Sequence, residues 1–95
     1  MFCVNILTPE QESLSNRFAK KGEDKFSGVA HQAGRNGAPV LDGTLVSMVC
    51  DIDQVVAGGD HQIVCGRVID IIDNDSAEAQ PLLFHAGRYG ALTRT

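Results

Sequence analysis

A carboxylate and an imidazole stand next to each other at Asp60 and His61, directly after two glycines. Two segments with strand patterns flank this stretch, Thr44 to Val56 and Gln62 to Ile72. Glycine lets the backbone reverse tightly, so the sequence predicts a hairpin that presents Asp60 and His61 at a sheet edge. An imidazole at that place could hydrogen-bond a ligand near neutral pH. The alternative is a solvated turn without a ligand.

Lys25 and Phe26 form a second candidate, inside a polar, glycine-rich stretch from Lys20 to Pro39. We expect this stretch to be an excursion with at most short secondary structure, and such loops often carry binding groups. The ammonium group could meet a phosphate, and the aromatic ring could offer a flat apolar surface. Alternatively, Phe26 anchors the loop to the core and Lys25 is merely solvated.

The elements that position these residues begin with a strand at Phe2 to Leu7. Asn5 on this strand is expected to hydrogen-bond a neighbouring strand or loop. Thr8 starts a helix, because Pro9 suits the first turn and Gln11 can close a capping box. This helix should run to about Ala19, with Leu14 and Phe18 as its buried stripe and with Glu10, Glu12 and Arg17 in water.

The second half of the chain indicates further strands. Thr44 to Asp53 alternates in polarity, which is typical of a half-buried antiparallel strand. Gly66 could mark a bulge in the following strand. Pro81 introduces a last short strand, Leu82 to His85, and an exposed turn is expected at Gly87 to Gly90. The predicted class is therefore mainly β with one or two helices.

Composition bounds the function. The 95 residues are expected to form one domain, 1–95. Twelve acidic and eight basic side chains give a net charge of −4 without a basic stripe, which argues against nucleic-acid binding. No apolar run approaches the roughly 20 residues of a membrane span, and no secretory signal pattern is present, so we expect no membrane association and a cytoplasmic location.

Other chemistries lack their patterns. The three cysteines and three histidines have no spacing typical of a metal or redox site, so no metal is expected. The serines lack the context of a hydrolase nucleophile. The glycines form neither a dinucleotide fingerprint nor a phosphate loop, so any nicotinamide would bind outside a Rossmann fold.

Six segments follow one another along the chain: Phe2 to Leu7, a short helix ending near Phe18, Asp24 to Val29, Gly37 to Leu41, Gly59 to His61 with Gly66 to Val68, and Pro81 to Phe84 with Arg88 and Tyr89. This succession resembles the flavin reductase family, whose members supply reduced flavin to two-component monooxygenases. The resemblance covers nearly the whole chain.

The resemblance implies an FMN-binding split barrel of Greek-key type and hydride transfer from NADH or NADPH to FMN or FAD. Lys25 and Phe26 would lie beside the flavin, Asp60 and His61 on the nicotinamide side, and Arg88 and Tyr89 near either ring. No catalytic side chain is expected, because the two cofactors carry the hydride chemistry. Arg88 and Tyr89 could instead be a turn packed by the tyrosine. The implied partners are a monooxygenase that receives diffusing reduced flavin and a second copy in a homodimer.

One departure from the family pattern stands out. Family members carry an additional N-terminal stretch before the strand that corresponds to Phe2 to Leu7, so the barrel is expected to be incomplete at the N-terminus. A truncated reading frame, a split protein and a short form that completes itself by dimerisation are the three explanations. Two other functions stay open: a non-catalytic flavin-binding barrel, and a structural or dimerisation module without a ligand.

Overall fold

The computed structural model describes residues 1–22, 24–74 and 79–93, and in these ranges the chain is mainly β with one α-helix. Most elements lie within one or two residues of their predicted positions. They are β1 (Phe2–Ile6), the 3₁₀ turn η1 (Pro9–Gln11), α1 (Glu12–Ala19), β2 (His31–Ala33), β3 (Pro39–Leu41), β4 (Val46–Gly58), β5 (His61–Asp73), β6 (Leu83–His85) and β7 (Arg88–Gly90).

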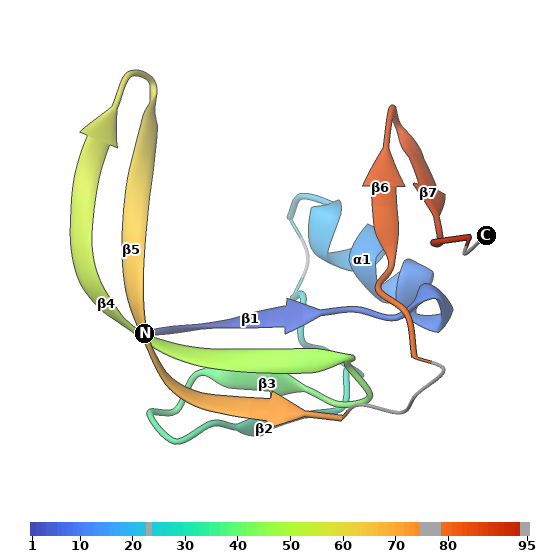
Figure 1. The fold of residues 1–95 in the computed structure, drawn as a ribbon, viewed down its shortest axis with the longest axis horizontal. Helices are drawn as coiled ribbons and strands as arrows, with labels where there is room; N and C mark the ends of the chain where they lie inside the picture. The colour runs from blue at the N-terminus through green and yellow to red at the C-terminus, as the bar shows by residue number, and fades with distance from the viewer. Residues whose placement is uncertain (23, 75–78, 94–95) are drawn as a thin grey trace.

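The strands of the described ranges form three separate antiparallel sheets. The largest has the order β1-β4-β5, and β2-β3 and β6-β7 are two-stranded. Figure 1 shows β4 and β5 bending away from the rest as a long hairpin, while α1 and the β6-β7 hairpin lie together on the other side. The sheets of the described ranges are open, which agrees with the prediction of a barrel that is incomplete at the N-terminus.

The helix starts as the sequence predicts. The backbone amide of Thr8 donates to Oε1 of Gln11 at 3.0 Å, which is the Gln half of the capping box. Pro9 occupies the first turn, which is 3₁₀, and the α-helix then runs to Ala19. Among the described residues, no helix combines the length and the apolar character that crossing a membrane requires.

The core of the described residues is small and lies where β1, β3 and β4 meet. Its buried members are Ala38, Leu41, Thr44, Ser47, Val49 and Cys50. Asn5 on β1 bonds to this core: its Oδ1 accepts from the Leu41 amide at 3.1 Å and from the Ser47 hydroxyl at 2.8 Å. The prediction that Asn5 bonds a neighbouring strand is therefore confirmed.

The outer part of the β4-β5 hairpin, residues 51–58 and 61–67, is here called the arm. β1 pairs only with Val46 to Cys50, so within the described ranges the arm strands pair only with each other. Apolar side chains are exposed on both faces of the arm: Val55 and Val64 lie opposite each other on one face, and Val56 and Ile63 on the other. The radius of gyration is 14.6 Å, above the roughly 12 Å of a compact chain of this length.

The sequence predicts a bulge at Gly66 of β5, and the structure has one on the opposite strand, β4. The β4-β5 register shifts between Ile52 and Gln54, where Asp53 is the extra residue of β4. It shifts again between Val49 and Cys50, where Ile69 is the extra residue of β5, so the strand that contains Gly66 has its irregularity three residues later. Gly66 serves a different need, because a Cβ there would lie 2.4 Å from the Phe2 ring and 3.2 Å from the Cys50 Cβ. Gly66 lets the Phe2 ring, on β1, lie close against β5 at the base of the arm.

We therefore predict that Gly66→Ala lowers the free energy of unfolding by about 1–3 kcal/mol, because the new methyl must displace the Phe2 ring. Chemical denaturation measures this change. Gly90→Ala is the matched control, since its Cβ would meet nothing within 4 Å. Adding Phe2→Leu should restore part of the loss, and equal stabilities of the Gly66 and Gly90 variants would contradict the packing argument.

Candidate functional site

Asp60 and His61 lie at the tip of the arm, as predicted. Gly58 pairs with His61, so the loop has two residues, and the first, Gly59, has a φ of 68°. A glycine with positive φ at this position is the requirement of a type II′ turn. Both side chains are almost fully exposed, at 83% for His61 and 91% for Asp60.

The two side chains form one hydrogen-bonded unit, with His61 Nδ1 and Asp60 Oδ1 2.5 Å apart. A carboxylate only accepts, so Nδ1 carries the proton that is shared. The pairing thereby fixes the imidazole orientation and leaves Nε2 free to contact a ligand. The pair can therefore recognise a polar group at the tip of the arm.

Phe26 is packed rather than free. Its ring lies edge-on to Phe18 of α1, with centroids 5.2 Å apart, and tilted against His31 at 5.0 Å. The Phe26 amide donates to Oδ1 of Asp24 at 3.0 Å, a hydrogen bond that stabilises the turn at residues 24–26. Phe26 thus anchors its loop to the helix, and its half-buried ring remains part of the loop surface.

Lys25 has the most unusual environment in the described part of the chain. Its ammonium nitrogen is buried and has no hydrogen-bond partner among the described residues. A buried cation without a partner is costly, so native structures normally supply an acceptor. An anionic group such as a flavin phosphate would supply it. On this observation the loop fits the cofactor that the sequence implied.

Arg88 and Tyr89 lie in β7, which corrects the prediction of an exposed turn at Gly87 to Gly90. The turn is one step earlier, at Ala86 and Gly87, whose φ values are 52° and 78°. Two consecutive positive φ values match a type I′ hairpin turn, whose twist suits paired strands. The sequence missed it because alanine rarely adopts positive φ.

Tyr89 attaches the β6-β7 hairpin to α1. Its hydroxyl lies 2.9 Å from the Ser15 hydroxyl and donates to Oδ1 of Asn16 at 3.3 Å. A phenol has one hydrogen, so Ser15 is the donor in its bond to Tyr89. The ring also contacts Phe84, with centroids 5.0 Å apart. Arg88 is exposed beside it.

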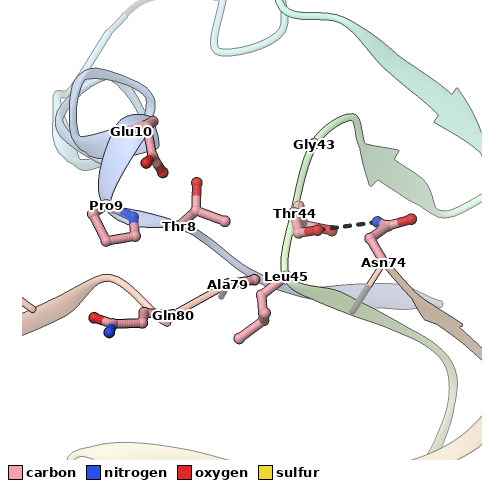
Figure 2. A pocket seen from close by; sticks show the side chains of 9 residues that line it. All are labelled: Thr8, Pro9, Glu10, Gly43, Thr44, Leu45, Asn74, Ala79 and Gln80. Atoms are coloured by element: carbon pink, nitrogen blue, oxygen red, sulfur yellow. Dashed lines mark hydrogen bonds between the residues drawn. The ribbon is translucent and has the colours of Figure 1, made fainter. Parts of the chain in front are cut away.

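A hollow of about 630 Å³ opens beside Arg88 and Tyr89, along the β6-β7 hairpin from Leu83 to Ala91. A second cleft, of about 730 Å³, lies between the 3₁₀ turn and the Gly43 to Leu45 loop. In Figure 2 Thr8 and Glu10 line it on one side, and the Asn74 amide donates to the Thr44 carbonyl on the other. None of the predicted site residues lines this second cleft.

The helix brings two of the three candidate segments together. Arg17 and Phe18 hold the Lys25 loop, and Ser15 holds Tyr89. The Asp60–His61 pair does not join them: in Figure 1 the arm tip and the β6-β7 hairpin stand far apart. A ligand on the helix side and a ligand at the arm tip therefore occupy different parts of this chain.

Sequence reasoning missed the polar residues of α1. Arg17 was expected in water, but it is half-buried and donates to the Lys25 carbonyl at 3.2 Å and the Asp24 carbonyl at 3.3 Å. Its position next to Phe18, at the edge of the apolar stripe, was the available signal, since an arginine stem can cover apolar surface.

The titratable groups suggest no further chemistry. Burial raises the pKa of the Cys3 thiol, and the nearby Cys50 thiol acts in the same direction, so Cys3 is a poor nucleophile. Residues 1–22, 24–74 and 79–93 contain no group of three or more histidine, cysteine or acidic side chains arranged to hold a metal ion.

The chain matches the family model described as the flavin reductase like domain, over residues 1–93. It is 43% identical over 91 residues to a flavin reductase of Pseudomonas putida, covering 94% of this chain and 51% of that protein. It is 39% identical over 88 residues to the reductase subunit of a flavin-dependent monooxygenase of Mycobacterium tuberculosis strain H37Rv, covering 93% and 47%.

Among solved structures, the fold is similar to the NADH:FAD oxidoreductase of Streptomyces globisporus in complex with NAD and FAD fragments. The TM-score is 0.85 at 30% identity, over 96% of this chain and 55% of that one. The chain spans about half the length of the curated relatives it matches. With a fold of this kind and a family match along almost its whole length, the chain belongs to the flavin reductase like domain family.

We predict that Tyr89→Phe lowers the free energy of unfolding by about 1 kcal/mol, because Ser15 and Asn16 lose a shared partner while the ring contact with Phe84 remains. Thermal or chemical denaturation measures this loss. Ser15→Ala should lower the free energy of unfolding less in the Tyr89→Phe background than in the wild type, because the hydroxyl that Ser15 contacts is already absent. Full additivity of the two substitutions would show that the hydroxyls do not interact.

Proposed function

We propose that this chain reduces FMN or FAD with NADH or NADPH and supplies the reduced flavin to a partner monooxygenase. The observation that carries the proposal is the family match over residues 1–93. The relatives' names support the two halves of the reaction: one is a monooxygenase reductase subunit, and another is an NADH:FAD oxidoreductase. The flavin and nicotinamide supply the hydride chemistry when bound, and the chain binds and orients them.

The flavin binds on the helix side of the molecule in this proposal. The buried, unpartnered ammonium of Lys25 supports a phosphate contact, and the half-buried Phe26 offers apolar surface to the ring system. Arg88 and Tyr89 border a hollow, Tyr89 bonds to the same helix, and the two residues would contact either ring. These four residues act by position and charge.

Asp60 and His61 hold the nicotinamide in this proposal. The Asp60 carboxylate orients the imidazole, whose exposed Nε2 would hydrogen-bond the dinucleotide. Hydride transfer requires the two rings at about 3 to 3.5 Å. Since the arm tip lies far from α1 in Figure 1, the reaction needs an assembly that brings the two ligand sides together.

A homodimer is the assembly we propose, with the arm as its contact surface. Val55, Val56, Ile63 and Val64 are between 39% and 55% exposed, one opposed pair on each face of the arm, and exposed apolar surface marks interaction sites. Among the residues that the structure describes, the outer edges of the arm strands have no strand partner and are open to pairing. We further propose that residues 1–95 act as one domain of the split-barrel type in the cytoplasm.

The proposed reaction predicts that the purified chain oxidises NADH only when FMN is present. His61→Ala should retain FMN binding and raise the KM for NADH by about tenfold, because a ligand hydrogen bond of about 1.4 kcal/mol is lost. NADH absorbance follows turnover, and flavin fluorescence follows binding. Gln62→Ala is the control at the same tip.

The outcomes separate the rival functions. Unchanged turnover in His61→Ala would remove the nicotinamide role. Flavin binding without NADH oxidation would favour a non-catalytic flavin-binding barrel. Absence of any flavin-induced rise in Tm would favour a structural module, since a ligand that binds only the folded state must stabilise it.

The proposed dimer predicts that Val55→Asp converts the protein to a monomer, because a carboxylate would be buried opposite Val64 in the contact. Sedimentation velocity measures the mass of the species in solution. Leu92→Asp is the control, because Leu92 is equally exposed, at 49% against 50% for Val55, and lies outside the arm. A monomeric wild type, or a dimer that survives Val55→Asp, would exclude the arm as the contact.

A further inference from the structure

Four consecutive residues of α1 hold both segments that we assign to the flavin. Ser15 and Asn16 bond to the Tyr89 hydroxyl, and Arg17 and Phe18 contact the loop that contains Lys25. Residues one or two apart on a helix point in different directions, so a short stretch can reach two neighbours at once. The helix therefore sets the position of the loop relative to the β6-β7 hairpin.

Arg17 makes the most contacts of this stretch with the loop. Its Nε donates to the Lys25 carbonyl at 3.2 Å, and its Nη2 donates to the Asp24 carbonyl at 3.3 Å and also to the Ser27 carbonyl. A guanidinium is planar and presents several donors in a fixed fork, so one side chain can gather successive carbonyls of a turn. A lysine has one nitrogen and cannot reproduce this geometry.

The fork determines where the Lys25 backbone lies. The Lys25 carbonyl points to Arg17, the Phe26 amide is held by the Asp24 carboxylate, and the Phe26 ring is packed on Phe18. Arg17 also binds the Asp24 carbonyl, so the main chain is held on both sides of the Lys25 Cα. The Lys25 side chain therefore starts from a fixed point, and its ammonium group ends buried without a partner among the described residues. Holding a desolvated cation before the ligand arrives is a form of preorganisation.

We propose that Arg17 is the positioning residue of the flavin-binding loop: its guanidinium holds the carbonyls of Asp24, Lys25 and Ser27 so that the Lys25 ammonium meets the flavin phosphate. This inference rests on the proposed function, because it takes the flavin as the ligand of Lys25. Arg17 itself acts through the loop and does not touch the ligand.

The test compares Arg17→Lys and Arg17→Ala with wild type, using FMN as the probe and flavin fluorescence to measure Kd. Both variants should bind FMN about tenfold more weakly, the equivalent of about 1.4 kcal/mol. In turnover, the KM for FMN should rise while kcat stays near the wild-type value. Amide hydrogen exchange should speed up at residues 24–29, and added guanidinium ion should restore part of the affinity of Arg17→Ala.

Arg35→Lys is the matched control. Arg35 is exposed and its Nη1 lies a long 3.5 Å from the Ile69 carbonyl, away from the Lys25 loop, so this variant should keep the wild-type Kd. Lys25→Ala provides the second comparison: if Arg17 acts through Lys25, adding Arg17→Lys to Lys25→Ala should weaken FMN binding much less than it does in wild type.

Failure of the inference differs from failure of the proposed function. A wild-type chain that binds no FMN would overturn the proposed function and, with it, the flavin role of the loop. A wild-type chain that binds FMN, with an Arg17→Lys variant of equal affinity, would overturn the role of Arg17 alone. Faster exchange at residues 24–29 with an unchanged Kd would also overturn it, because the loop would then be held for stability only.

Discussion

The side-chain amide of Asn5 is the interaction on which the arrangement of this small protein depends. Its Oδ1 accepts from the Leu41 amide and the Ser47 hydroxyl, and its Nδ2 donates to the Pro39 carbonyl at 3.3 Å, which joins β1 to β3 and β4. Since Ser47 gives its hydrogen to Asn5, the Thr44 hydroxyl must donate to Ser47 at 2.7 Å. The network satisfies polar groups inside a core too small to hold the strands by apolar burial alone.

The end of β1 carries this constraint to the candidate site. The Ile6 carbonyl accepts from the Leu45 amide at 2.8 Å, and the Leu7 carbonyl accepts from the Leu82 amide at 2.7 Å. The helix begins directly afterwards, and the segment leading into β6 is held at the same point. The flavin side of the proposed site is thus set by short-range connections around one strand end, whereas in the described part of the chain the arm tip is joined to it only through the length of β4 and β5.

Local patterns were sufficient to predict most of the fold from the sequence. The capping residues at Thr8 and Gln11, the glycine turn before Asp60 and the alternation of β4 each act over a few residues, and all three are present in the structure. The exposed arm, the use of Gly66 by Phe2 and the half-buried state of Arg17 depend on which distant residues meet, and one sequence does not contain that information. The family resemblance named the candidate segments, and the structure separates the two segments that α1 holds from the pair at the arm tip.

We propose that flavin and nicotinamide are recognised by two separate parts of this chain. Nuclear magnetic resonance titration of the isotope-labelled protein tests it most directly, first with FMN and then with added NAD⁺. The account predicts that FMN shifts the amide signals of Lys25, Phe26, Arg88 and Tyr89, and that the nicotinamide then shifts those of Asp60 and His61. FMN shifts that leave Lys25 and Phe26 unchanged, or nicotinamide shifts that leave Asp60 and His61 unchanged, would contradict it.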